Sequence, residues 1–187
     1  MTQNRSVAVI VGSLRKASLN RRVAQVLVDL APPSLDARFV EIGELPLFNQ
    51  DLDDAGSPPE AWTHFRARVK GFDALLFVTP EYNRSMPGVL KNALDVGSRP
   101  YGQSVWGGKP GAVITASPGA TGGFGSNHHL RQTLVSLDVP TMTQPEVYLG
   151  KADAFFDDGG QLTDERTRTY LAGFMTAFAA WVGKQLG

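Results

Sequence analysis

Three loops rich in glycine, serine and asparagine carry the groups that could bind and transform a small molecule. The first, residues 12–20, has the sequence GSLRKASLN and runs into a predicted helix. Ser13, Ser18 and Asn20 offer hydrogen-bond donors, and Arg15 offers a planar, two-pronged contact. The amino terminus of a helix adds unpaired N–H groups and a partial positive charge. This combination favours a phosphate group as the ligand; the alternative is an ordinary loop in which Ser18 or Asn20 caps the helix.

The second and third loops contain groups that suit a flat, polar ligand. Residues 80–88 have the sequence PEYNRSMPG, in which Tyr82 offers an aromatic face with a polar tip. Residues 117–126 have the sequence SPGATGGFGS, and their glycines would let the backbone approach a ligand closely. The alternatives are a plain turn with a helix cap for the second loop and a flexible loop for the third.

Strands and helices alternate along the chain between these loops. Apolar runs predict strands at residues 7–11, 38–42, 73–79, 112–116 and 143–149. Apolar residues at helical spacing predict helices at residues 20–31, 60–70, 87–96, 130–137 and 163–186. Residues 43–59, rich in Pro, Gly and Asp, are predicted to form a long loop.

This alternation predicts an α/β fold with a parallel sheet and helices on both of its faces. A length of 187 residues suits a single domain, residues 1–187. Ligands of such sheets bind beyond the carboxyl ends of the strands. Because all three loops follow predicted strands, they are expected to meet there and form one site.

Composition argues against several classes of protein. Eighteen Lys and Arg residues balance eighteen Asp and Glu residues, so a basic nucleic-acid-binding protein is not expected. The absence of cysteine excludes disulfides, thiolate nucleophiles and cysteine-ligated metals. No apolar run approaches the ~18 residues of a membrane helix. Residues 1–5 lack the layout of a signal peptide, so a cytoplasmic protein without a membrane partner is expected.

Several sequence patterns that would indicate other sites are missing or weak. The first loop lacks both G-x-x-x-x-G-K-[ST] and G-x-G-x-x-G, and no serine lies in G-x-S-x-G. His128 and His129 are adjacent, so on a helix they would point apart and chelate a metal poorly; no metal site is predicted. Charge is uneven: residues 1–28 contain five basic side chains and no carboxylate, whereas residues 41–60 contain six carboxylates and no base.

The blocks GSLRKASLN, PEYNRSMPGVLKNALD and SPGATGG, in this order, resemble the NADPH-dependent FMN reductase family, which includes quinone and chromate reductases and related azoreductases. The resemblance extends from about residue 7 to residue 146. It implies a flavodoxin-like three-layer sandwich whose five-stranded parallel sheet has the order 2-1-3-4-5. It also implies non-covalently bound FMN and a homodimer or homotetramer.

The resemblance also implies roles for individual residues. Ser13, Arg15, Ser18 and Asn20 match the residues that hold the FMN phosphate, with Leu14 and Lys16 among them. Two further groups match loops on either side of the isoalloxazine ring: Pro80, Glu81, Tyr82 and Asn83, and then Ser117 and Gly119. Tyr82, Arg99 and Tyr101 match the open substrate face. No residue is expected to act as a catalytic acid or base, because the cofactor carries the chemistry.

The activity implied is an NAD(P)H oxidoreductase that passes hydride from NADPH or NADH to the flavin and then reduces a small molecule. Quinones are the expected acceptors, with chromate, other metal oxyanions or azo compounds as further ones. Three alternatives stay open: a flavodoxin-type electron carrier, a reductase that supplies reduced FMN to a monooxygenase, and a flavin-free dinucleotide dehydrogenase.

The chain departs from the family pattern at two places. Many relatives have Trp where this chain has Val96 and Gly97. Residues linked with tetramer contacts in some relatives are replaced here by Arg84, Gly125 and His128. The resemblance therefore implies a dimer more directly than a tetramer.

Overall fold

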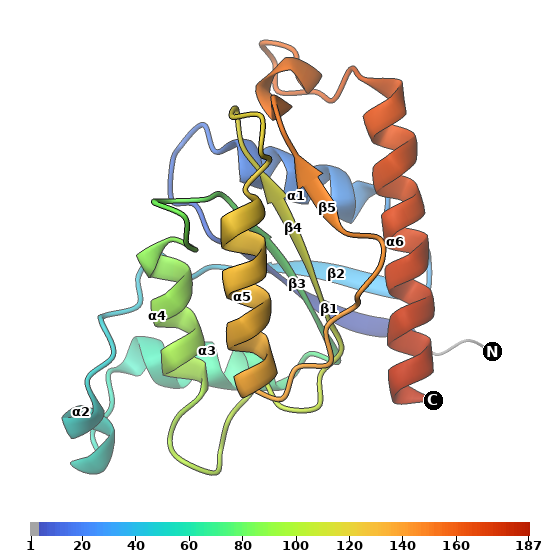
Figure 1. Cartoon of the computed structure of the whole chain (residues 1–187). Helices are drawn as coiled ribbons and strands as arrows, with labels where there is room; N and C mark the ends of the chain where they lie inside the picture. Colours follow the sequence, from blue (N-terminus) through green and yellow to red (C-terminus); the bar gives the residue numbers. More distant parts are fainter. Residues whose placement is uncertain (1–3) are drawn as a thin grey trace.

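A five-stranded parallel sheet forms the centre of the computed structural model, which describes residues 4–187 (Figure 1). The strands are β1 (Arg5–Val11), β2 (Leu35–Val40), β3 (Ala74–Thr79), β4 (Gly111–Ala116) and β5 (Val147–Leu149). Every neighbouring pair is parallel, and the order is β2-β1-β3-β4-β5. The predicted flavodoxin-like sheet is confirmed. Residues 1–3 of the polar amino-terminal segment lie outside the described residues.

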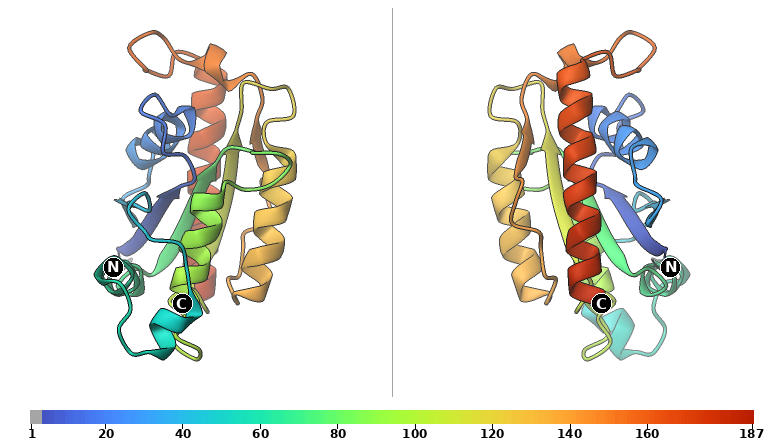
Figure 2. Two further views of the ribbon diagram at one scale, coloured as in Figure 1. Left: turned by 90° about the vertical axis from the view of Figure 1, so that its left-hand side faces the viewer. Right: turned by 90° about the vertical axis from the view of Figure 1, so that its right-hand side faces the viewer.

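Alternate residues of the central strands face opposite helical layers, as the pleat of a strand requires. Val7 and Val9 pack toward α1 (Leu19–Asp29) and α6 (Glu165–Leu186). Ala8 and Ile10 pack toward α3 (Glu60–Lys70), α4 (Gly88–Gly97) and α5 (Phe124–Ser136). Figure 2 shows α6 along one face of the sheet and α4 and α5 on the other. The three layers explain why β3 and β4 are buried along their whole length.

The apolar residues of the predicted carboxyl-terminal helix belong to the core. Leu171, Phe174, Met175, Phe178 and Val182 of α6 are buried against the sheet. Asp164 caps the helix by accepting a hydrogen bond from the backbone N–H of Thr167 at 2.6 Å. No helix within residues 4–187 is long and apolar enough to cross a membrane.

Three elements, β2, β5 and α5, differ from the prediction by three residues or more at one end, and one further turn was not predicted. β2 begins at Leu35 and ends at Val40, because Leu35 pairs with the start of β1 and Ile42 lies past the ladder. β5 contains only three residues, not the predicted 143–149. α5 begins at Phe124 rather than residue 130, since residues 125–129 are glycine and polar residues and show no apolar periodicity. A 3₁₀ turn, η1 (Ala152–Phe155), follows β5.

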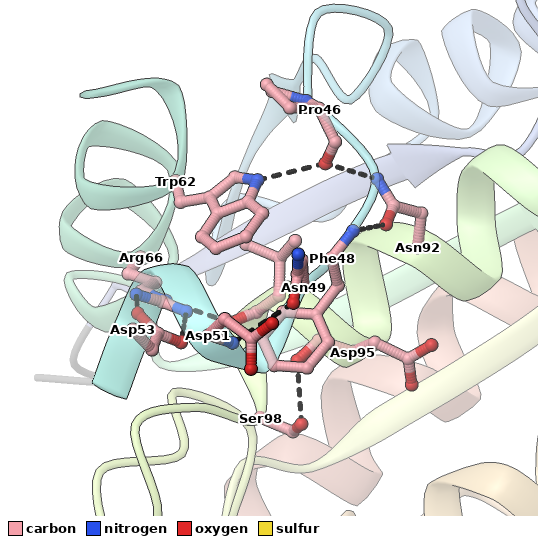
Figure 3. A network of polar contacts seen from close by, with 11 residues as sticks. Pro46, Phe48, Asn49, Asp51, Asp53, Trp62, Arg66, Asn92, Asp95 and Ser98 are labelled. Atoms are coloured by element: carbon pink, nitrogen blue, oxygen red, sulfur yellow. Dashed lines mark hydrogen bonds and ion pairs between the residues drawn. The ribbon is translucent and has the colours of Figure 1, made fainter. Parts of the chain in front are cut away.

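The predicted long loop, residues 43–59, contains the short helix α2 (Gln50–Asp54) and is fastened to α3 and α4 (Figure 3). The carbonyl of Pro46 accepts hydrogen bonds from Trp62 Nε1 at 2.9 Å and Asn92 Nδ2 at 3.0 Å. Asp53 pairs with Arg66 through two hydrogen bonds of 2.8 and 2.6 Å, and both side chains are almost fully buried. One carboxylate of the acidic segment therefore has a structural partner in α3.

Candidate functional site

The three loops meet beyond the carboxyl ends of β1, β3 and β4, as predicted (Figure 1). The backbone N–H of Gly12 donates to the carbonyl of Val78 at 2.9 Å, which joins the first loop to β3. The amide of Asn20 donates to the carbonyl of Ala116 at 3.0 Å, which joins the start of α1 to the end of β4. Segments more than 90 residues apart in sequence are thus held at one edge of the sheet.

The first loop offers a set of unused donors at the amino terminus of α1. The backbone N–H groups of residues 13–17 donate no hydrogen bond within residues 4–187. Arg15 and Lys16 are exposed and form no ion pair in the same part of the chain. Ser18 caps α1 by accepting a hydrogen bond from the N–H of Arg21 at 3.1 Å. The capping alternative is therefore correct for Ser18, while its hydroxyl proton stays free to bind an anion.

Asn20 is buried between the first and third loops, with 3% of its surface exposed. Its Nδ2 serves the carbonyl of Ala116, whereas its Oδ1 accepts no hydrogen bond in the described chain. Buried polar atoms are nearly always satisfied, so an orphaned oxygen beside this loop indicates a missing donor such as a ligand hydroxyl or a water.

The second loop is a tight two-residue turn. Tyr82 and Ser85 exchange backbone hydrogen bonds of 2.9 and 3.1 Å, and the residues between them, Asn83 and Arg84, have φ of 52° and 68°. Positive φ at both central positions is the geometry of a type I′ turn, which asparagine tolerates well. The turn leaves Tyr82 nearly half exposed at the rim. The N–H groups of residues 81, 83 and 84 have no acceptor in the described chain.

The Glu81 side chain points toward α5. Its Oε2 accepts a hydrogen bond from the backbone N–H of Ser126 at 3.1 Å, and its Oε1 lies 3.5 Å from Arg84. The N-cap of α5 is Gly123, which has no side chain that could accept a hydrogen bond. The Glu81 carboxylate, from the neighbouring loop, therefore accepts from a free N–H of the first turn and offsets the partial positive charge of the helix terminus. Glu81 thus couples the second loop to the third.

Two glycines of the third loop, Gly122 and Gly123, are required by contacts within the protein. Gly122 and Gly123 have φ of +61° and +81°, and a Cβ on Gly122 would lie 2.6 Å from the carbonyl carbon of Tyr148. At these two positions, the close approach of the chain to itself already requires glycine. Ser117 Oγ accepts a hydrogen bond from the N–H of Gly119 at 3.0 Å and shapes the turn.

Arg99 and Tyr101 are not brought to this edge. They follow the carboxyl end of α4, which lies near the amino-terminal ends of the strands, at the opposite end of the sheet (Figure 1). Tyr101 is 90% exposed, and the guanidinium of Arg99 lies 5.8 Å from the centre of its ring. Within one chain, these two residues cannot share a pocket with the three loops.

Sequence reasoning missed a cluster of polar side chains beside the second and third loops. His129 Nδ1 lies 2.7 Å from Ser85 Oγ, and His128 Nε2 lies 3.0 Å from Tyr148 Oη. Phe124 packs against the His128 ring at 4.3 Å between centroids. The two histidines point to different partners, as their adjacency on a helix predicts. Their partners come from other elements, so no local pattern identified them.

Tyr148 is expected to ionise late. Burial, the hydrogen bond and charge of Glu146, and nearby Tyr170 raise its pKa from 10.0 to about 12. Since the unfolded chain would ionise first, Tyr148 adds stability that is fully present below pH 10 and is lost between pH 10 and about 12. Burial and the charge of Glu146 also raise the pKa of Tyr170. Spectrophotometric titration should therefore show a phenol with a pKa of about 12 that Tyr148→Phe removes. Ionisation of this phenol at pH 10 would contradict the assignment.

The unused donors of the three loops fit FMN. Its phosphate carries about −1.5 to −2 charges by analogy with other phosphomonoesters, and the first loop offers N–H groups, hydroxyls and Arg15 to such a group. The edge of its isoalloxazine ring is rich in nitrogen and carbonyl acceptors. The second and third loops offer free N–H groups at residues 81, 83, 84, 120 and 121. The donor set therefore matches both ends of the cofactor.

Comparison with known proteins agrees with this chemistry. The family described as NADPH-dependent FMN reductase matches residues 5–154. A quinone reductase from Pseudomonas putida is 60% identical over 182 residues, 97% of each chain. A 2-hydroxy-1,4-benzoquinone reductase from Burkholderia sp is 51% identical over 176 residues, 94% of this chain and 95% of that protein.

The fold is similar to those of solved flavoproteins. FerB, a flavoenzyme NAD(P)H:(acceptor) oxidoreductase from Paracoccus denitrificans, superposes with a TM-score of 0.90 at 42% identity and covers 97% of this chain and 98% of its own. A flavodoxin from Pseudomonas aeruginosa superposes with a TM-score of 0.57 at 18% identity over 95% of this chain and 99% of its own, which shows the shared fold alone. The chain therefore belongs to the NADPH-dependent FMN reductase family.

Proposed function

We propose that the chain is an FMN-dependent NAD(P)H oxidoreductase that reduces quinones. The observation that carries the proposal is the run of unused backbone N–H groups in three loops at one edge of the sheet. The quinone reductases at 60% and 51% identity support the choice of acceptor. When bound, FMN supplies the redox chemistry, taking hydride from the reduced nicotinamide and delivering electrons to the acceptor.

The residues of the chain would bind and orient the cofactor. Ser13, Arg15 and Ser18 would hold its phosphate, and buried Asn20 would fix the distance between the first and third loops. Free N–H groups of the second and third loops would hold the edges of the ring, which orients it without covering both faces. Tyr82, nearly half exposed at the rim, would border the open face. An open face also supports chromate, other metal oxyanions and azo compounds as further acceptors.

Steady-state kinetics test this proposal. The FMN-loaded protein should oxidise NADPH or NADH in the presence of p-benzoquinone. If donor and acceptor use one pocket in turn, double-reciprocal plots at several quinone concentrations should be parallel. Bound FMN without any NAD(P)H oxidation would overturn the proposal in favour of an electron carrier.

Replacing Arg15 with glutamine should weaken FMN binding about 10- to 100-fold, since a hydrogen bond to a charged group contributes about 1.5–3 kcal/mol. Quenching of FMN fluorescence measures the dissociation constant. Arg166→Gln is the matched control, because Arg166 is also exposed but lies on α6. Equal dissociation constants for both variants would remove Arg15 from the phosphate site.

We also propose that the chain self-associates as a homodimer or homotetramer. Arg99 and Tyr101 lie at the far end of the sheet from the three loops, so a role at the substrate face requires a second copy. Light scattering after gel filtration of the FMN-loaded protein should give a mass of at least two chains. A monomer would contradict both self-association and the role of these two residues.

A further inference from the structure

A cavity of about 460 Å³ lies between α1 and the turn that precedes α6. It adjoins the first loop, because residues 16–18 of that loop form part of its lining, and it extends along the outer side of α1. Figure 2 shows α1 and α6 on the same side of the sheet. Its remaining lining residues are Arg21, Arg22, Gln25, Val26, Asp29, Gly160, Gln161, Leu162 and Arg168.

The lining carries four cations and one carboxylate, and part of the positive charge has no partner. Arg21 is paired with Glu41 at 2.7 Å. Arg168 donates to the carbonyl of Leu162 at 2.7 Å and lies 3.3 Å from a Glu165 oxygen. The one carboxylate of the lining, Asp29, accepts from a glutamine of the same helix.

Arg22 and Lys16, in contrast, have no side-chain acceptor or ion pair anywhere in residues 4–187. Lys16 is exposed, as an unpaired lysine usually is, whereas Arg22 is half-buried. An uncompensated, partly desolvated guanidinium is costly, and an anion in the cavity would satisfy it.

The turn before α6 lies against the Arg22 guanidinium at the wall of the cavity. Gly160 has φ of +82°, and its N–H donates to the carbonyl of Asp157 at 2.9 Å. A Cβ on Gly160 would lie 3.2 Å from Arg22 Nε, so the missing side chain provides the space in which the guanidinium lies. The space for the Arg22 side chain is thus provided by a turn about 140 residues away in sequence.

The rest of the lining suits a flat base. Val26 and Leu162 provide an apolar surface, and Gln25 and Gln161 provide amides that donate and accept hydrogen bonds. The volume lies within the roughly 300–1,000 Å³ of small-molecule sites.

We propose that this cavity binds the adenosine end of the NADPH donor, with Arg22 and Lys16 facing its 2′-phosphate. The inference rests on the proposed function, because the donor reacts at the edge where the first loop lies. It assigns Arg22 as a specificity-determining residue for NADPH over NADH.

Calorimetric titration of the FMN-loaded protein with 2′,5′-ADP tests the proposal without turnover. Binding should be weakened about tenfold or more by Arg22→Gln, restored in part by Arg22→Lys and unchanged by Arg166→Gln. The same ligand should compete with NADPH. Arg22→Gln should raise the KM for NADPH, leave the KM for NADH unchanged and leave FMN content unchanged.

Each other outcome overturns the assignment in a distinct way. Absence of 2′,5′-ADP binding, or binding that Arg22→Gln leaves intact, would show that the cavity is no adenosine phosphate site. If 2′,5′-ADP binds but does not compete with NADPH, the cavity binds a free nucleotide and does not bind the adenosine end of the donor. If the proposed function itself fails, no variant will oxidise NADPH, whereas the titration with 2′,5′-ADP still reports on the cavity.

Discussion

Replacing Gly12 with alanine is expected to weaken FMN binding about 100-fold, equivalent to about 2.7 kcal/mol. A Cβ on Gly12 would lie 2.2 Å from Thr79 Oγ1 and 2.8 Å from Thr79 Cβ. Contacts this short force the end of β1 away from β3, and overpacking of this kind costs about 1–3 kcal/mol. Because Gly12 joins the first loop to β3, the displacement would move the phosphate donors relative to the second loop.

FMN fluorescence titration measures this loss, and thermal unfolding without FMN reports any accompanying loss of stability. Gly173→Ala is the matched control: it lies in α6, and its new Cβ would have no heavy atom within 4 Å. The control should bind FMN normally and be slightly more stable, since alanine favours a helix over glycine. Equal FMN affinities in the two variants would show that the junction of β1 and β3 does not set the site.

Replacing Asp53 with alanine is expected to lower the free energy of unfolding by about 3–5 kcal/mol, the usual cost of leaving one member of a buried ion pair without its partner. The Asp53 and Arg66 side chains are 4% and 11% exposed and are joined by two hydrogen bonds. Arg66 also donates to the carbonyl of Val96 at 2.8 Å. The change therefore loosens α2, α3 and the end of α4 together (Figure 3).

Urea unfolding of the wild type and variants measures this effect. Lys91→Ala is the control, because it breaks the exposed pair with Asp95 and should cost less than about 1 kcal/mol. Asp53→Ala combined with Arg66→Met should recover part of the stability, since the uncompensated buried charge is removed. Similar losses for Asp53→Ala and Lys91→Ala would contradict the structural role of the buried pair.

The sheet and the three loops could be predicted because their signals are local. Each central strand is a continuous apolar run, and each loop follows a strand directly, so the parallel topology alone gathers the loops at one edge. The helical spacing in α6 likewise identified its buried face. These features depend on neighbouring residues only. The order of the strands, in contrast, was implied by the resemblance to the FMN reductase family, and it agrees with the structure.

The remaining features depend on contacts between distant segments. The helix α2 has five residues and no apolar periodicity, and it is fastened by the partnership of Asp53 with Arg66, thirteen residues later. The direction of the Glu81 side chain follows from the bare amino terminus of α5, 45 residues away. The placement of Arg99 and Tyr101 at the opposite end follows from the antiparallel course of α4 relative to β3. A resemblance to a family matches residues by position, but it does not show whether a residue contributes to the site of its own subunit or to that of another copy.

Calorimetric titration of the flavin-stripped protein with FMN shows whether the three loops converge to hold one FMN. We expect saturable binding of one FMN per chain, with weaker binding in both Arg15→Gln and Gly12→Ala. If the folded protein took up no FMN, or if both variants bound FMN as tightly as the wild type, the three loops would not form the FMN site.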